Sequence, residues 1–241
     1  MKSKKLKKWT TLLTCATALT VMTACSQSSS QSTGTTSSTT SKTSAVTATT
    51  SKKTNKNNSN YFTSKDSDTS YNESSATKIK LSGSSADVSG DGAALSGSTV
   101  TISKAGTYVI SGKSDGLQIK VDAGDSDDVH IVLDGATMTN TNAAINATKA
   151  GHVYLTLKDG TTNTLSDSSS NSDEDADAVI FSKGDLTING SGTLNIDAKK
   201  NNGIKANDSL HMTGGTYKIS SVGDAFNVND ELNITGTTMT I

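Results

Sequence analysis

A pattern of alternating apolar and polar residues is repeated three times between residues 177 and 241. The copies begin at Asp177, Asn202 and Asp224, and each contains three alternating segments and a turn with glycine. The aligned apolar positions are Val179, Ile204 and Phe226; Phe181, Ala206 and Val228; Leu186, Leu210 and Leu232; Ile188, Met212 and Ile234; Leu194, Tyr217 and Met239; and Ile196, Ile219 and Ile241. Because successive side chains of a strand point to opposite faces, each segment predicts a strand with one buried face.

The repeat length constrains the fold further. The copies are 25 and then 22 residues apart, measured from Ala178 to Gly203 and from Gly203 to Ala225. A unit this short cannot bury its own apolar face, so such a repeat indicates stacked coils that share one core. We therefore predict an all-β parallel β-helix with about 22–25 residues per coil. A leucine-rich repeat is disfavoured, because its consensus asparagine and any helical periodicity are absent.

Longer coils are predicted upstream of the repeat. The same alternation indicates strands at residues 99–102, 107–110, 117–121, 129–133, 134–138, 144–147, 153–157 and 162–165. The coil from Leu117 to Ile145 has 28 residues, and the coil from Ile145 to Val179 has 34. The excess in the second coil is one acidic insertion at residues 166–176. Insertions in a solenoid protrude from one face, which is commonly the binding face.

Residues 1–24 have the features of a lipoprotein signal peptide. Five lysines lie within residues 2–8, and an uncharged, moderately apolar run of 16 residues follows from Trp9 to Ala24. This run is shorter than the roughly 20 residues that a spanning helix requires. Small residues directly before Cys25 resemble the bacterial lipobox, so we expect Cys25 to carry a lipid anchor on the extracellular side of the membrane. An ordinary signal peptide with an incidental Cys25 is the alternative.

Residues 25–77 consist largely of Ser, Thr, Asn, Gln and Lys. They offer too few apolar groups to offset the entropy of ordering, so we predict a disordered linker that spans about 40 Å, enough to reach into a Gram-positive cell wall. The folded domain is predicted at residues 78–241, as a monomer. Ile241 aligns with positions in the middle of the helix, so we expect the domain to be C-terminally incomplete, which the gene sequence beyond this codon would decide.

The predicted domain is acidic. It holds 12 lysines and 20 acidic residues, a net charge of −8, which disfavours nucleic acid and favours cations as partners. Asp173, Glu174 and Asp175 lead directly into the first copy of the repeat. Stacked strands lie about 4.8 Å apart, so the three residues that begin the copies are expected to form a column of oxygen atoms.

These acidic residues predict a calcium (Ca²⁺) site. Calcium takes about six to eight oxygen ligands from carboxylates, amides, backbone carbonyls and water. Like charges stacked at this spacing also repel one another unless a cation lies between them. The alternative is a ladder of Asx side chains that only hydrogen-bonds the turn, beside a solvated loop. The predicted ligands are Asp173, Glu174, Asp175, Asp177, Asn202 and Asp224.

Catalytic and cofactor-binding residues are not predicted. His130, His152 and His211 lie in different coils with no cysteine ligand near them, and none stands in evident relation to a Ser and an Asp, so a hydrolytic triad has no support. A polysaccharide lyase usually needs a strong base such as arginine beside calcium, and the chain has no arginine. Lysine can serve as the base in some lyases, so this activity is disfavoured and stays open. The lysines available for that role are Lys183, Lys205 and Lys218.

The repeat phrase resembles that of a bacterial family of carbohydrate-binding parallel β-helix lipoproteins of the clostridial cell-surface type. The phrase is an Asp or Asn, a small residue, an apolar residue, a polar turn and then L-x-I-x-G-G-T, and the resemblance covers about residues 78–241. It implies a right-handed parallel β-helix similar to polysaccharide lyases, with calcium sites and affinity for acidic plant polysaccharide and cellulose. It also implies calcium-side positions at Asp177, Asn202 and Asp224, where Asn202 departs from the acidic pattern.

We therefore expect a cell-surface lipoprotein that binds extracellular acidic polysaccharide, such as polygalacturonate, with calcium bridging protein and sugar carboxylates. A polysaccharide lyase and a structural surface adhesin are the alternatives. The only tryptophan, Trp9, lies in the leader, so the domain lacks the residue that stacks best on sugar rings, and crystalline cellulose is the weaker candidate. The membrane is expected as a partner only through the lipid anchor.

We predict that the Cys25→Ser substitution releases the protein from cells into the medium, because the lipid on Cys25 holds the mature chain at the membrane. Cell fractionation with immunoblotting measures the change. Cys15→Ser is the matched control, since Cys15 lies within the apolar run and leaves with the leader. A Cys25→Ser protein that stays in the membrane fraction would place the anchor elsewhere.

Overall fold

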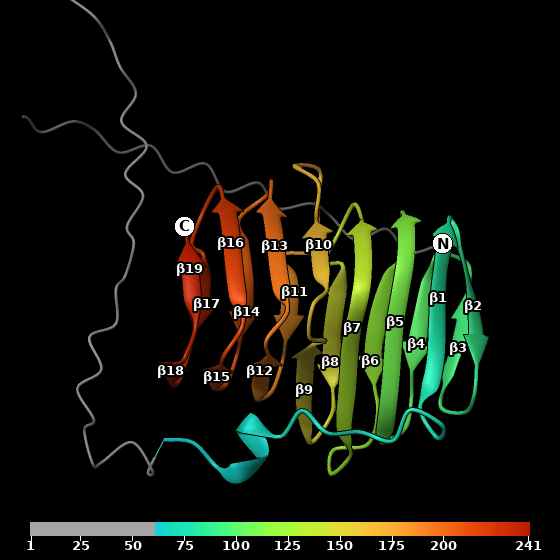
Figure 1. Ribbon diagram of the computed structural model, residues 1–241. Helices are drawn as coiled ribbons and strands as arrows, with labels where there is room; N and C mark the ends of the chain where they lie inside the picture. The colour runs from blue at the N-terminus through green and yellow to red at the C-terminus, as the bar shows by residue number, and fades with distance from the viewer. Residues whose placement is uncertain (1–60) are drawn as a thin grey trace, which may run out of the picture. The chain divides into compact units, whose positions relative to one another are not determined.

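The computed structural model describes residues 61–241, so the leader, Cys25 and most of the predicted linker lie outside the described residues. Strands make up almost all of the regular structure, and they form coils that stack side by side (Figure 1). The strands belong to one seven-stranded and one twelve-stranded sheet, and pairing between successive coils is parallel. The prediction of an all-β parallel β-helix is confirmed. The described residues include no helix long and apolar enough to cross a membrane.

The seven-stranded sheet receives one strand from each coil and an additional strand, β3 (Ala93–Ser96), that pairs antiparallel with β4 (Thr99–Ile102). In its strand β6 (Gln118–Asp122), Ile119 and Val121 are fully buried, whereas the alternate residues are more exposed. This alternation gives the sheet an apolar inner face and a polar outer face. Its other strands are β8 (Ile145–Lys149), β11 (Ala178–Ser182), β14 (Asn202–Ala206) and β17 (Phe226–Val228).

The twelve-stranded sheet has two rows of strands joined by the long strand β7 (Asp128–Thr139). One row is β9 (His152–Leu157), β12 (Leu186–Gly190), β15 (Leu210–Thr213) and β18 (Leu232–Thr235). The other row is β10 (Thr162–Ser166), β13 (Thr193–Ala198), β16 (Thr216–Ser221) and β19 (Thr238–Thr240). The sequence predicted separate strands at 129–133 and 134–138, but β7 runs through both and pairs with β9 and then with β10.

The inner side chains stack in columns that cross the coils. Leu186 pairs with Leu210, and Leu210 pairs with Leu232. The predicted columns of Ile188, Met212 and Ile234 and of Leu194, Tyr217 and Met239 are confirmed in the same way. Burying one such side chain contributes about 1.5–3 kcal/mol, so these columns are the main source of stability.

Two predicted columns are wrong by one residue in the first copy, where Ile180 stands in place of Val179 and Ser182 in place of Phe181. The alignment placed Val179 beside Ile204, but the structure pairs Ile180 with Ile204, and Ile204 with Phe226. These three residues each precede the leucine of the next strand by six positions, so the extra residue of the first copy lies before Ile180. A shift of one residue moves side chains to the opposite face of a strand. Phe181, predicted on the inner face, therefore lies on the outer face, level with Lys205.

An antiparallel cap that the sequence did not predict covers the first coil. It is built from β1 (Thr77–Gly83), β2 (Ser85–Ser89) and β3, and β5 (Gly106–Asp115) joins β1 to β7. β2 pairs antiparallel with β1, and β3 pairs antiparallel with β4. The cap occupies strand edges that would otherwise present unpaired backbone groups.

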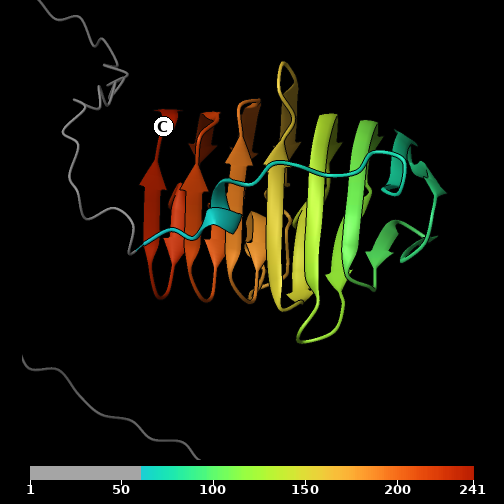
Figure 2. The same cartoon turned by 60° about the horizontal axis from the view of Figure 1, so that its bottom comes forward.

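Residues 61–76, called the strap below, lie across the strands of the twelve-stranded sheet (Figure 2). The strap contains the short 3₁₀ helix η2 (Ser64–Ser67), which contacts β12 and β15. The sequence assigned these residues to the linker and began the domain at Lys78, so the predicted start of the folded part is too late. The strap docks through hydrogen bonds and through a small apolar cluster, in which Tyr71 and Ala76 pack with Val109 and Val132. These contacts do not follow the alternating apolar pattern by which a sequence reveals a packed strand.

Glycine recurs in the turn after the second strand of the last three coils, at Gly190, Gly214 and Gly236. Their φ angles are 94°, 90° and 64°, a region that disfavours other residues. A Cβ atom at Gly190 would also lie 2.2 Å from the carbonyl oxygen of Leu157 in the preceding coil. Backbone conformation and close stacking therefore both require glycine at this turn.

We predict that Gly190→Ala lowers the free energy of unfolding by about 2–4 kcal/mol, because it adds backbone strain and a steric overlap. Urea unfolding measures the loss. Gly184→Ala is the matched control: its added Cβ would lie 3.8 Å from the nearest atom, a carboxylate oxygen of Asp208, so a change within about 0.5 kcal/mol is expected. Equal losses in the two variants would contradict this account of the turn.

Candidate functional site

The outer face of β8, β11 and β14 carries a row of polar and aromatic side chains. Asn146 pairs with Phe181, and Phe181 pairs with Lys205, so three successive coils place these side chains at one level. The acidic insertion returns to this face, where its Ala176 packs against Phe181 and Ala143 in a small apolar cluster. The sheet face and the insertion together form the walls of a groove.

The groove has a volume of about 410 Å³. Small-ligand sites commonly occupy about 300–1,000 Å³, so this size suits a sugar unit. Polar side chains surround a single aromatic ring, and both carboxylate and ammonium groups are present. The lining residues are Asn146, Thr148, Asp173, Asp175, Ala176, Phe181, Lys183 and Asn207.

Asn146 is the most informative residue of the groove. It is only 8% exposed, and its Oδ1 has no hydrogen-bond partner among the described residues. A buried polar atom without a partner costs about 1–3 kcal/mol, so a native protein normally supplies one. Asn146 also lines the groove, so a rotation of its side chain would present this oxygen to a ligand hydroxyl or a cation.

The lysines near the groove differ in how firmly they are held. Lys205 Nζ lies 2.8 Å from Asp177 Oδ1, and both side chains are mostly buried. Burial acts to raise the pKa of Asp177, but hydrogen bonds from Lys205 and Asn201 outweigh it and bring the pKa below its usual range. Lys183 is exposed and forms no ion pair within the described part of the chain. Lys183 is therefore available to a ligand, whereas Lys205 is already neutralised.

Asp177 is out of register with Asn202 and Asp224, the other two residues of the predicted column of oxygen ligands. Asn202 pairs with Ala178, so Asp177 lies one position earlier, where it accepts a hydrogen bond from Asn201. Asn202 is buried, and its Oδ1 accepts a 3.3 Å hydrogen bond from the backbone N–H of Asp224. The register of the column was wrong because the first copy has one extra residue before its inner strand position. These contacts belong to the Asx hydrogen-bonding that the sequence left open as an alternative.

The acidic insertion places two predicted ligands in the groove, Asp173 and Asp175. Asp173 Oδ1 accepts hydrogen bonds from the backbone N–H groups of Asp175 and Ala176, at 3.1 and 3.0 Å, which hold the turn. Within residues 61–241, no three His, Cys, Asp or Glu side chains gather closely enough to hold a metal ion. The predicted ligands that do not line the groove are Glu174, Asp177, Asn202 and Asp224.

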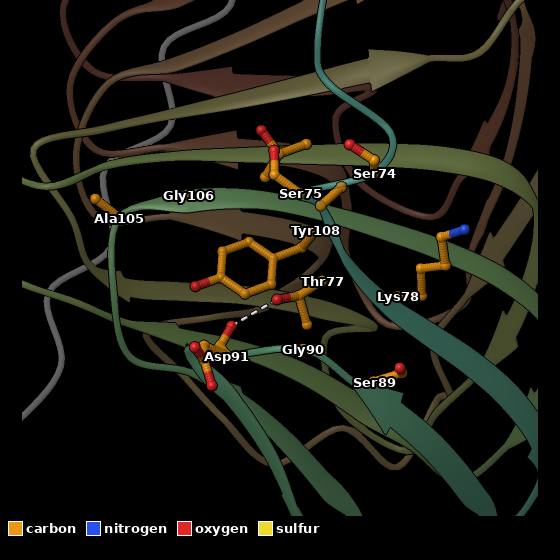
Figure 3. Close-up of a pocket in the computed structure, with 12 residues that line it drawn as sticks. Ser74, Ser75, Thr77, Lys78, Ser89, Gly90, Asp91, Ala105, Gly106 and Tyr108 are labelled. Atoms are coloured by element: carbon orange, nitrogen blue, oxygen red, sulfur yellow. Dashed lines mark hydrogen bonds between the residues drawn. The ribbon is translucent and has the colours of Figure 1, made fainter.

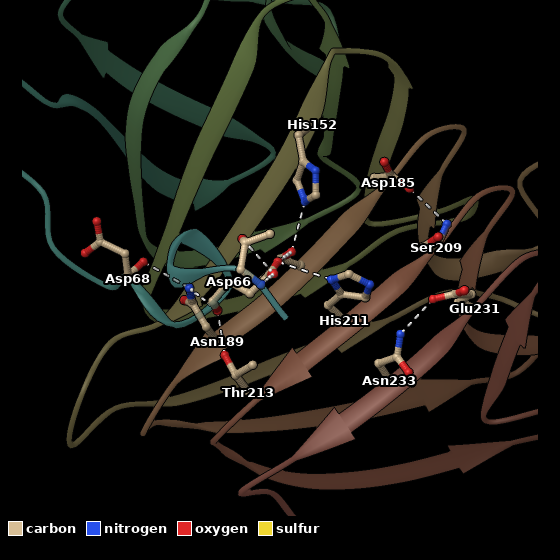
Figure 4. Close-up of polar contacts among 12 residues, drawn as sticks. Asp66, Asp68, His152, Asp185, Asn189, Ser209, His211, Thr213, Glu231 and Asn233 are labelled. Atoms are coloured by element: carbon tan, nitrogen blue, oxygen red, sulfur yellow. Dashed lines mark hydrogen bonds and ion pairs between the residues drawn. The ribbon is translucent and has the colours of Figure 1, made fainter. Parts of the chain in front are cut away.

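A second polar cluster lies beneath the strap (Figure 4). The buried carboxylate of Asp66 accepts a 2.7 Å hydrogen bond from the Thr187 hydroxyl and lies 3.3 Å from His211 Nδ1. The backbone oxygen of Asp66 accepts hydrogen bonds from Asn189 and Thr213, at 3.2 and 2.6 Å. The strap accepts the hydrogen bonds of Thr187, Asn189 and Thr213, so these three side chains already have partners.

The histidines belong to the strap-covered face. His130 hydrogen-bonds to Thr156 at 2.7 Å, and His152 hydrogen-bonds to Thr187 at 2.9 Å. Burial lowers the pKa of both histidines. The histidines lie on separate coils, as the sequence predicted. The strap that covers them was not predicted, because no local pattern marks its docking.

Another hollow, of about 530 Å³, lies at the N-terminal cap around Tyr108 (Figure 3). The ring of Tyr108 is buried, and its hydroxyl donates a 2.8 Å hydrogen bond to the backbone oxygen of Lys104. The Thr77 hydroxyl likewise donates to the backbone oxygen of Asp91 at 2.6 Å. Both hydroxyl groups already have partners, so this hollow has fewer groups ready for a ligand than the groove does.

The stacked coils define a parallel β-helix, and the groove is its candidate binding site. The chain belongs to the family of carbohydrate-binding domain-containing proteins, whose family model matches residues 96–241. This range includes every residue of the groove and excludes the strap and much of the cap hollow. The family match therefore favours the groove as the functional site.

The chain is similar to a curated relative and to a solved structure. A carbohydrate-binding domain-containing protein from Acetivibrio thermocellus is 36% identical over 137 residues, which is 54% of this chain and 48% of the relative. The chain thus spans about half the length of that curated relative. The solved structure of a polysaccharide lyase-like protein from C. thermocellum, a gadolinium derivative, matches with a TM-score of 0.56 and 24% identity. It covers 69% of this chain and 100% of the solved chain, and at this identity the match supports the fold.

We predict that thermal stability falls as the pH decreases from about 7.5 to about 5. Burial keeps His130 and His152 neutral in the folded protein. In the unfolded chain the two imidazole rings bind protons near the ordinary histidine pKa of about 6.5, so the free energy of unfolding decreases as the pH falls below that value. Burial acts to raise the pKa of Asp66, but its hydrogen bonds, led by that from Thr187, lower it. The stability that Asp66 contributes is therefore lost only at lower pH, as the pH falls below the ordinary pKa of an Asp carboxyl group.

Thermal melting across this pH range measures the effect. The double variant His130→Gln with His152→Gln should melt with a smaller pH dependence than the wild type, because it lacks the two buried titrating rings. Identical pH dependence in the two proteins would contradict the assignment to these histidines.

Proposed function

We propose that this chain binds acidic polysaccharide, of the polygalacturonate type, in the groove on the outer face of β8, β11 and β14. The unpartnered buried oxygen of Asn146 beside Lys183 carries the proposal. The amide oxygen can accept a hydrogen bond from a sugar hydroxyl, and the ammonium group can form an ion pair with a uronate carboxylate. A neutral glycan would use the first contact and leave the second without a partner.

Calcium fits the same groove as a bridging ion. Asp173 and Asp175 provide carboxylates, and Asn146 provides an amide oxygen, all of the ligand type that calcium prefers. These oxygens are fewer than calcium requires, in keeping with the absence of a three-carboxylate cluster among residues 61–241. A sugar carboxylate and water would complete the shell, so calcium and polysaccharide are expected to bind together.

A polysaccharide lyase is the second candidate, favoured by the position of one lysine. Of the three lysines considered as bases, Lys183 lines the groove, whereas Lys205 is paired with Asp177 and Lys218 lies in β16 of the other sheet. If Lys183 in its neutral form took the proton from the carbon beside a uronate carboxylate, the glycosidic C–O bond at the next carbon would break. The departing sugar oxygen would take a proton from water, and the new C=C bond would give an unsaturated product that absorbs in the ultraviolet. A structural adhesin would show neither this product nor retention of polygalacturonate.

The cellular setting is part of the proposal and rests on the leader. Anchoring through Cys25 would hold the domain on the extracellular side of the membrane, where polysaccharide is accessible. The linker after Cys25 would let the groove reach ligand within the cell wall.

We predict that the wild type retains polygalacturonate with calcium and loses at least about tenfold in affinity when a chelator is added, since an ion bridging two carboxylate groups is removed. Asp173→Asn with Asp175→Asn should reproduce the loss in calcium, and Lys183→Gln should weaken binding about fivefold or more. Isothermal titration calorimetry and affinity electrophoresis measure these changes.

Asp197→Asn is the matched control, because Asp197 is an exposed carboxylate on β13 of the other sheet. It should bind as the wild type does. Binding that is unchanged in chelator would remove calcium from the proposal, and unchanged binding by all groove variants would move the site elsewhere. Unsaturated product from the wild type, lost in Lys183→Gln, would favour the lyase.

A further inference from the structure

We propose that the groove continues into a second subsite, in which Lys149 binds the carboxylate of another uronate of the same polysaccharide chain. This inference rests on the proposed function and extends it from a single sugar unit to a polymer that runs along the axis of the β-helix.

A second hollow, of about 320 Å³, adjoins the groove. It is lined by Asp125, Thr148, Lys149, Ala150, Lys183 and Gly184. Thr148 and Lys183 line the groove as well, so the two hollows are neighbours that share one wall. The Thr148 hydroxyl donates a 3.0 Å hydrogen bond to the backbone oxygen of Val121, which fixes this shared residue between them.

The combined surface crosses four consecutive coils. Asn207 follows β14, Lys183 follows β11, Lys149 ends β8, and Asp125 follows β6. Stacked strands are about 4.8 Å apart, so four coils span about 14 Å, which exceeds the size of one sugar ring. A ligand that fills both hollows must therefore be an oligomer, and it lies across the strands.

The charges of the two hollows fit a repeating anion. Lys149 Nζ lies 3.5 Å from Asp125 Oδ1, and these side chains are 46% and 85% exposed. Exposed pairs of this kind contribute little, so a ligand carboxylate can replace Asp125 at small cost. Lys205 differs, because its 2.8 Å contact with Asp177 is largely buried. Lys183 and Lys149 are thus the two cations that successive carboxylates can reach.

Gly184 keeps the second hollow open. The backbone does not require glycine here, since its φ lies outside the positive region and an added Cβ would meet only the Asp208 carboxylate at 3.8 Å and the Ala150 oxygen at 3.9 Å. A side chain could therefore be accommodated by the fold, but it would project into space that the hollow provides. The absence of a side chain at Gly184 leaves room for a ligand.

The test compares digalacturonate with hexagalacturonate, both with calcium, by isothermal titration calorimetry. The wild type should bind the hexamer about tenfold more tightly than the dimer, because only the hexamer reaches Lys149. Lys149→Gln should reduce this ratio to about twofold and leave dimer binding unchanged. Gly184→Leu should lower the ratio by steric exclusion, and its melting temperature checks that it is folded.

Lys113→Gln is the matched control, since Lys113 is an exposed lysine on β5, in the other sheet. It should keep the wild-type ratio. Two outcomes would overturn the second subsite and leave the groove in place. The first is a wild-type ratio of hexamer to dimer affinity in both Lys149→Gln and Gly184→Leu, and the second is an equal loss of affinity for the two oligomers. Failure of the wild type to bind either oligomer would overturn the proposed function together with the subsite.

Discussion

Stacking of equivalent side chains from neighbouring coils is the interaction on which the rest of this structure depends. No coil can bury its apolar face alone, so each inner side chain is covered by the equivalent side chain of the next coil, as Leu186 is by Leu210. This stacking works only in one register, because a shift of one residue would turn the inner side chains outward. Glycine at the turns permits the close approach, and Gly190 lies too near the Leu157 carbonyl to carry a side chain.

A core organised in this way leaves the outer face free to specialise. Outer positions of β8, β11 and β14 contribute little to the core, so they can hold Asn146, Phe181 and Lys205 at one level without loss of the fold. The acidic insertion adds a second wall and places Asp173 and Asp175 in the groove. Lys205 forms a largely buried ion pair and has a structural role, whereas the exposed ion pair of Lys149 leaves that lysine accessible to a ligand.

The strap shows a second way of attaching a segment to this scaffold. It docks through Asp66, whose carboxylate and backbone oxygen together receive hydrogen bonds from three strand residues, more than 100 positions away in the sequence. These three strand residues lie on β12 and β15, which become neighbours only when the coils stack. A polar segment of this kind resembles a linker by composition, because hydrogen-bond partners leave no periodic signal.

The sequence alone determined the class of fold, the coil length, most of the inner columns and the position of the acidic insertion, because each of these is written in local alternation and repeated. It also identified Asp173 and Asp175 as residues of interest. Only the tertiary structure decided that Ile180 and not Val179 stacks on Ile204, since one extra residue can be absorbed before or after a strand. The pairing of Asp177 with Lys205, the unpartnered oxygen of Asn146 and the docking of the strap likewise required three-dimensional contacts, because each depends on residues that folding alone brings together.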